Sequence, residues 1–125
     1  MENASDAELA VMRIVWGHPE GALFAQVQEE LAQQGTPCHA NALIVLFSRL
    51  QKKGYLRAEK KGRRNVYTAL IQESAYQEQQ TQLLVDKAYG GSTWGLVANL
   101  VTGDKLTEAE YAELRELLRS RRPEP

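Results

Sequence analysis

Residues 54–70 read GYLRAEKKGRRNVYTAL. Leu56 and Ala58 alternate with charged residues, a glycine-containing turn follows at 62–65, and residues 66–70 are rich in strand formers. The pattern predicts a two-stranded hairpin with a strongly basic tip. Because a lone hairpin is only marginally stable in water, this one has to pack against helices.

Three helices are predicted before the hairpin. Ser5 and Glu8 have the spacing of a capping box, which opens a helix over about residues 6–16. Apolar residues at helical spacing predict a second helix that ends at Gly35 and a third over about residues 39–53, which Gly54 terminates. The third helix has a core stripe of Leu43, Leu46, Phe47 and Leu50. Three helices followed by a basic hairpin are the order of a winged helix-turn-helix, which we assign to residues 1–71.

The rest of the chain is predicted to be helical. Helices are expected over about residues 73–89, from a cap at Ser92 through Val101, and after a second capping box at Thr107 and Glu110. Their apolar stripes are too thin for a good core, so residues 72–125 are predicted to form a helical dimerisation region that interlocks with a second copy. The fold class is therefore mainly α with a small β-hairpin.

The net charge of −1 conceals an uneven distribution of charge. Residues 39–70 carry eight basic residues against Glu59 alone, while the segments on both sides are acidic overall. One interpretation of this basic segment is a solvated charged face. The alternative is a surface that binds the phosphates of nucleic acid.

The outward face of the third helix supplies the predicted DNA contacts. We expect Asn41 to hydrogen-bond adenine and Ser48 to hydrogen-bond a base or a phosphate. The methyl groups of Ile44 and Val45 are expected to pack on those of thymine. The predicted backbone clamps are the basic residues Arg49, Lys52 and Lys53 of this helix and Lys60, Lys61, Arg63 and Arg64 of the hairpin. Alternatively, Ile44 and Val45 form an apolar docking patch, and the chain is a winged-helix protein-interaction module with weak or no DNA binding.

These 125 residues contain few of the side chains that other classes of function need. Cys38 is the single cysteine, which excludes an internal disulfide and a cysteine-cluster zinc site. His18 and His39 are the only histidines, so residues for metal or charge-relay catalysis are scarce. No glycine-rich phosphate loop, carboxylate pair or nucleophile arrangement is present, so we predict no enzyme, no cofactor and no metal. No apolar run reaches about 20 residues and no signal peptide is seen, so we expect a cytoplasmic protein without membrane insertion.

Several segments together resemble the penicillinase and methicillin-resistance repressors and the related copper-responsive repressors. The first matches are Ser5 to Trp16 (SDAELAVMRIVW), Leu46 to Leu56 (LFSRLQKKGYL) and Gly62 to Tyr67 in the hairpin. Three further matches, Tyr89 to Ser92, Leu96 to Leu100 and Leu106 to Glu110, lie in the predicted dimerisation region. The resemblance covers nearly the whole chain, in order and with similar spacing.

The resemblance implies a homodimeric repressor that reads an inverted-repeat operator in double-stranded DNA at the promoter of a resistance operon. It also implies inactivation through a membrane-bound sensor protease pathway, with cleavage at a bond that corresponds to Asn99–Leu100 here. A small-molecule or copper-sensing regulator is a third interpretation. The chain lacks the paired cysteine tail of the copper-responsive members, and Cys38 alone disfavours copper.

Overall fold

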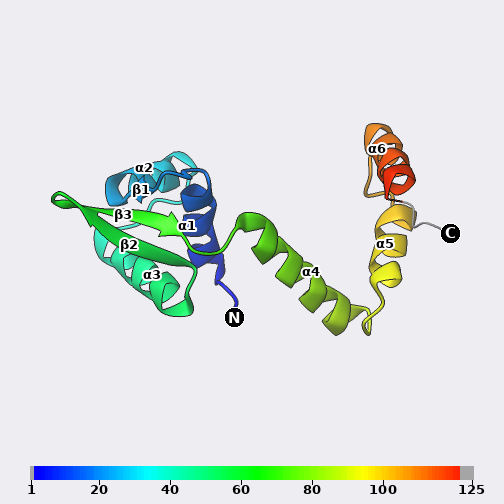
Figure 1. The fold of residues 1–125 in the computed structure, drawn as a ribbon, viewed down its shortest axis with the longest axis horizontal. Coiled ribbons are helices and arrows are strands. Elements are labelled where there is room, and N and C mark those ends of the chain that lie inside the picture. Colours follow the sequence, from blue (N-terminus) through cyan, green and yellow to red (C-terminus); the bar gives the residue numbers. More distant parts are fainter. Residues whose placement is uncertain (1, 122–125) are drawn as a thin grey trace. The chain divides into compact units, whose positions relative to one another are not determined.

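The computed structural model describes residues 2–121, which fold as six helices and three strands. The chain divides into two compact units, Met1–Gln77 and Glu78–Pro125. Figure 1 shows the elements, which in chain order are α1 (Asp6–Trp16), β1 (Ala22–Leu23), α2 (Phe24–Gln33), α3 (Ala40–Lys53), β2 (Leu56–Lys61), β3 (Arg64–Ala69), α4 (Glu73–Ala88), α5 (Thr93–Thr102) and α6 (Glu108–Ser120).

The first unit has one hydrophobic core to which α1, α2, α3 and the hairpin all contribute. Leu43, Phe47 and Leu50 of α3 are buried in it, as predicted, whereas Leu46 is only partly buried. The ring of Phe47 stacks on that of Tyr67 in β3, with the centroids 3.9 Å apart. These contacts fix the hairpin against α3, which explains how a hairpin too short to be stable alone stays folded.

The hairpin is confirmed, but its turn is shorter than predicted. β2 and β3 pair antiparallel as far as Lys61 opposite Arg64, so only Gly62 and Arg63 connect them. Arg64 and Asn65 therefore belong to β3 and not to the turn. The hairpin tip projects beyond the helices (Figure 1).

A third strand, β1, was not predicted. Ala22 and Leu23 pair with Tyr67 and Val66, which gives an antiparallel sheet with the order β1-β3-β2. Two residues are too few to show an alternating pattern, and their pairing partners lie far away in the sequence.

The ends of α1 and α3 follow from local chemistry. Ser5 and Glu8 form the predicted capping box, in which the Glu8 amide donates to Ser5 Oγ and the Ser5 amide donates to Glu8 Oε1. Gly54 ends α3 with a φ of 82°, a left-handed conformation that favours glycine. By contrast, α2 ends at Gln33, two residues before the expected stop at Gly35. The Leu23 side chain cannot cap its start, but Gln26 Oε1 accepts from the Leu23 amide at 2.8 Å.

The second unit is capped as predicted but has little core of its own. Ser92 Oγ accepts from the Gly95 amide at the start of α5, and Thr107 and Glu110 form a capping box at the start of α6. Tyr111 of α6 donates its hydroxyl hydrogen bond to the carbonyl oxygen of Val101 in α5 at 2.8 Å. Among residues 78–121, Val85 is the one buried hydrophobic side chain.

Candidate nucleic-acid interface

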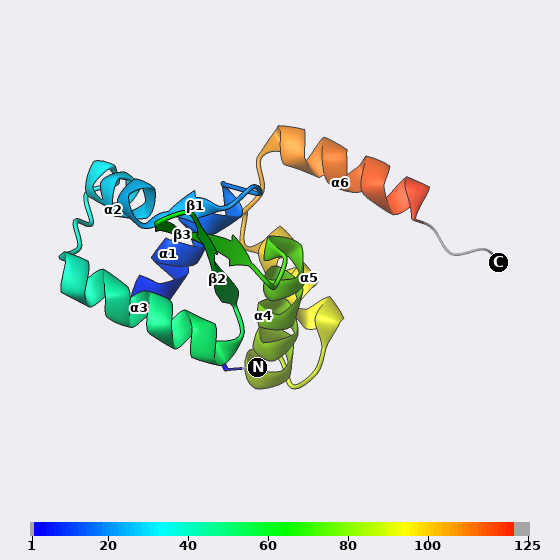
Figure 2. The same ribbon diagram turned by 60° about the vertical axis from the view of Figure 1, so that its left-hand side comes forward.

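One long side of α3 is left free by the packing of the first unit. Figure 2 shows this helix along the edge of the unit, with one side turned away from α1 and the sheet. Ile44 is 55% exposed and Val45 is 46% exposed, although both are aliphatic. The structure places five of the predicted contact residues on this exposed side, namely Asn41, Ile44, Val45, Ser48 and Lys52. Arg49 is also exposed, on the flank of the same surface.

The hairpin presents four cations without counter-charges. Lys60, Lys61, Arg63 and Arg64 are all exposed, and within residues 2–121 none of them forms an ion pair. Lys61 and Arg64 lie directly opposite each other in the ladder. Like charges in such a cross-strand pair are destabilising, so the tip carries a repulsion that a bound anion would relieve.

Lys53 lies apart from the other basic residues of α3. Its ammonium group is 2.8 Å from Glu8 Oε1 and donates to the carbonyl oxygen of Asn3 at 2.9 Å. The Lys53 side chain is 18% exposed and that of Glu8 only 2%. The structure thus ties Lys53 to the start of α1, a contact that the sequence did not indicate.

Glu8 is a buried carboxylate that this arrangement keeps ionised. Burial raises the pKa of the Glu8 carboxyl, but hydrogen bonds from Lys53 and Ser5 outweigh the burial and hold this pKa below its ordinary value. The ion pair joins the last turn of α3 to the first turn of α1. It therefore fixes the position of the exposed α3 face.

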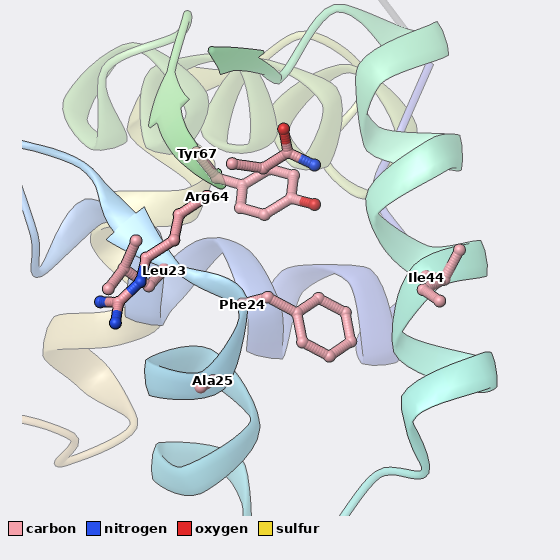
Figure 3. A pocket seen from close by; sticks show the side chains of 7 residues that line it. Leu23, Phe24, Ala25, Ile44, Arg64 and Tyr67 are labelled. Carbon is pink, nitrogen blue, oxygen red and sulfur yellow. The ribbon is translucent and has the colours of Figure 1, made fainter. Parts of the chain in front are cut away.

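A pocket of about 560 Å³ joins the α3 face to the hairpin. We call it the α2/α3/β3 pocket, and Figure 3 shows the residues that line it. They are Leu23, Phe24, Ala25, Ile44, Arg64, Asn65 and Tyr67. Only Ile44 and Arg64 of this set were predicted as site residues, because a pocket forms from segments whose contacts leave no local pattern.

The predicted cleavage pair lies inside α5. Asn99 and Leu100 are both exposed, and the Asn99 carbonyl oxygen accepts a hydrogen bond from the Gly103 amide at 3.0 Å. The peptide bond between them is therefore helical in this structure, and not extended.

Two other kinds of site are not formed by the described part of the chain. Among residues 2–121, no group of three or more His, Cys, Asp or Glu side chains is placed to hold a metal ion. No helix over the same residues is long and apolar enough to cross a bilayer.

Three helices, a small antiparallel sheet and a basic hairpin beside an exposed third helix define a winged helix-turn-helix protein. A profile of the penicillinase repressor family matches residues 4–120, and the chain belongs to this family. The family is named for a repressor.

Relatives and solved structures agree with this assignment. The chain is 35% identical to the penicillinase repressor of Bacillus licheniformis over 91% of its own length and 88% of the relative's. It is 29% identical to the methicillin resistance regulatory protein MecI of Staphylococcus aureus (strain N315), over 91% of both chains.

Two solved structures resemble part of the chain. The DNA-binding domain of the repressor BlaI superposes with a TM-score of 0.51 and 38% identity, over 61% of this chain and 94% of that one. Monomeric Bacillus licheniformis BlaI in complex with the blaP half-operator gives a TM-score of 0.51 and 39% identity, over 60% of this chain and 89% of that one.

Proposed function

We propose that the chain is a homodimeric transcriptional repressor that acts in the cytoplasm and reads an inverted-repeat operator. In this proposal residues 1–71 bind DNA and residues 72–125 hold the dimer together. The observation that carries the proposal is the exposed α3 face beside four unpaired cations of the hairpin, in a member of the penicillinase repressor family. The related BlaI was solved with a half-operator, which supports double-stranded DNA as the partner.

In this account α3 enters the major groove. Asn41 contacts adenine, Ser48 contacts a base or a phosphate, and Ile44 and Val45 pack their methyl groups against thymine. The basic residues grip the sugar-phosphate backbone or the adjacent minor groove, and they are Arg49, Lys52, Lys60, Lys61, Arg63 and Arg64. Lys53 is a further predicted clamp, and its ammonium group also forms an ion pair with Glu8.

A second copy would cover the apolar surface of the second unit. Exposed large apolar side chains in this unit are Leu83, Leu84, Trp94, Val97, Leu100, Leu117 and Leu118. A set of this size on so short a segment is unusual for a monomer and typical of an obligate interface. Two linked reading units would then bind two half-sites together, so the dimer gains affinity that one unit lacks.

Release from DNA would follow cleavage at Asn99–Leu100 by a membrane-bound sensor protease pathway. The bond lies in the part that we assign to dimerisation, so cutting it would separate α6 from the rest of the chain. The two reading units would then lose their connection, and operator affinity would fall.

The DNA-binding proposal is tested by removing charge from the hairpin tip. Arg63→Ala with Arg64→Ala should weaken binding to DNA from upstream of the chain's own gene by about tenfold or more, and reduce the slope of log K against log salt by about two. Arg13→Ala with Lys87→Ala removes the same charge from exposed positions outside the face and should leave both quantities nearly unchanged. Equal effects of the two pairs, or no binding by the parental chain at low salt, would overturn the proposal.

The exposure of Ile44 and Val45 favours one second candidate, a winged-helix protein-interaction module. Ile44→Lys with Val45→Thr separates the two functions. Improved or redirected DNA binding supports a position of this face in the groove. Loss of a protein partner with no effect on DNA binding supports docking.

A further inference from the structure

The α2/α3/β3 pocket is hollow enough to hold a small molecule. Its volume of about 560 Å³ lies within the range of about 300–1,000 Å³ that is usual for ligand sites. Three elements of the first unit form it, with Leu23, Phe24 and Ala25 at the start of α2, Ile44 on α3, and Arg64, Asn65 and Tyr67 on β3 (Figure 3).

The apolar part of the pocket is held rigidly by aromatic packing. Tyr67 is only 7% exposed, and its ring stacks on Phe47 behind it. Phe24 packs against the same Phe47 ring, with a centroid distance of 5.8 Å, and Figure 3 shows its ring projecting toward α3. Rings anchored in this way pre-form a surface on which a flat apolar group can lie without reordering the protein.

The charged part of the pocket consists of one free cation. Figure 3 shows the Arg64 side chain running from β3 toward Leu23. Within residues 2–121 no hydrogen bond or ion pair engages its guanidinium group, and no carboxylate lines the pocket. The first turn of α2, which borders the same space, also contains no acidic residue, so its helix dipole adds to the positive potential.

We infer that the α2/α3/β3 pocket binds a small organic anion with an aromatic body, such as an aromatic carboxylate. Arg64 would bind the carboxylate as a fork, Asn65 would supply a further polar contact, and the body would lie against Phe24, Ile44 and Tyr67. A bare phosphate fits this lining poorly, since it would satisfy Arg64 but set a strongly hydrated charge against apolar walls.

Occupation of the pocket also excludes DNA, a consequence that rests on the proposed function. Ile44 belongs to the face that would enter the major groove, and Arg64 to the hairpin that would grip phosphate. A ligand held between them takes the guanidinium away from DNA and adds bulk beside α3. The anion therefore acts as an inducer that releases the intact repressor by competition.

The site is tested with 2-naphthoate as the probe and the full chain in solution. Titration followed by amide NMR shifts should show saturable binding, with shifts at residues 23–25, 44 and 64–67.

Arg64→Gln should weaken binding about tenfold, because one charge-assisted contact is lost. Arg63→Gln, next to it but outside the lining of the pocket, should not weaken binding. Ala25→Phe should fill the pocket and abolish binding, and Ala32→Phe, at an exposed position of the same helix, should not. Shifts confined to residues 78–121, equal binding of inorganic phosphate, or unchanged binding by Ala25→Phe would overturn the inference.

Competition is measured separately, on the chain bound to its own upstream DNA. Saturating 2-naphthoate should raise the apparent Kd for DNA at least tenfold in the parental chain and in Ala32→Phe, and it should have no such effect in Ala25→Phe. Simultaneous binding of naphthoate and DNA would overturn competition. A chain that binds naphthoate but no DNA would support the pocket and contradict the proposed function. A chain that binds DNA but no naphthoate would contradict the pocket inference and support the proposed function.

Discussion

Lys52 and Lys53 are neighbours at the end of α3, yet their environments differ sharply. Lys52 is exposed on the outward face, whereas Lys53 is largely covered and pairs with the buried Glu8. A buried carboxylate that loses its partner is costly, because its charge then stays desolvated and uncompensated. Lys53 therefore helps to position α3, whereas Lys52 is free to make the DNA contact that we propose.

This difference predicts opposite results for two identical substitutions. Lys53→Met should lower the free energy of unfolding by about 3 kcal/mol, since Glu8 loses its ion pair. Lys52→Met should change it by less than about 0.5 kcal/mol and should weaken DNA binding instead. Urea unfolding, followed by circular dichroism, measures the stability of both variants. Equal stability of the two variants would show that the Glu8 contact is unimportant.

The ion pair between Lys53 and Glu8 could not be predicted from the sequence, for a physical reason. The helices, their caps at Ser5 and Thr107, and the stop at Gly54 depend on residues within one or two turns, so local patterns predicted them. The contact between Lys53 and Glu8 joins residues 45 positions apart. A lysine at the end of a helix looks the same in the sequence whether it faces DNA or an earlier helix, and only packing distinguishes the two cases.

At the scale of the elements, β1 depends on Gly21. This residue enters the strand with a φ of 108°, and a Cβ atom placed there would lie 2.2 Å from Val66 Cγ1 in β3. The chain can thus enter β1 this close to β3 only because Gly21 has no side chain. The two-residue strand and its glycine carry no repeating pattern, which is why the sequence did not predict them.

Gly21→Ala should therefore be much more damaging than Gly35→Ala. Gly35 also has a positive φ, of 80°, but a Cβ atom placed there would meet nothing within 4 Å, so alanine at this position should cost only about 1 kcal/mol of backbone strain. Gly21→Ala adds a clash with Val66 and should cost about 3 kcal/mol in total. Thermal or urea unfolding of both variants checks the order, and a similar loss at the two positions would contradict the pairing of β1 with β3.

The helix α5 controls access to the predicted cleavage bond. A protease acts on a locally opened segment, so the turn around Asn99 has to unwind before cutting. We predict that Asn99→Ala leaves DNA binding intact but prevents loss of the full-length chain in cells that receive an inducing antibiotic. Immunoblotting against time measures this, with Thr102→Ala in the same helix as the control that should be lost normally. If the Asn99→Ala variant disappears at the same rate as the parental chain, the Asn99–Leu100 bond is not the cleavage site.

At the scale of the whole molecule, the small core of the second unit is the reason that we propose a dimer. Trp94 is 74% exposed and Leu118 is also largely exposed, while Val85 is the one buried hydrophobic side chain among residues 78–121. The sequence indicated this from thin apolar stripes, although it did not show which residues meet across the interface. The total charge of the chain is near neutral because the acidic segments at both ends balance the basic middle segment.

A charged pair of substitutions should break the dimer. Trp94→Glu with Leu118→Glu should give a monomer by light scattering coupled to size exclusion, and it should weaken operator binding at least tenfold through the loss of two-site attachment. Leu70→Glu changes an exposed apolar residue of the first unit and should leave the dimer intact. A dimer that persists in the double variant would place the interface elsewhere.

If two copies of this chain read one operator as a symmetric pair, a footprint should show it. The full chain is titrated onto DNA from upstream of its own gene, and backbone cleavage by hydroxyl radicals is mapped on both strands. We predict two equivalent protected half-sites related by twofold symmetry, separated by whole turns of the double helix and filled together as the concentration rises. No protection at low salt, or a single asymmetric site filled by one copy, would contradict the account.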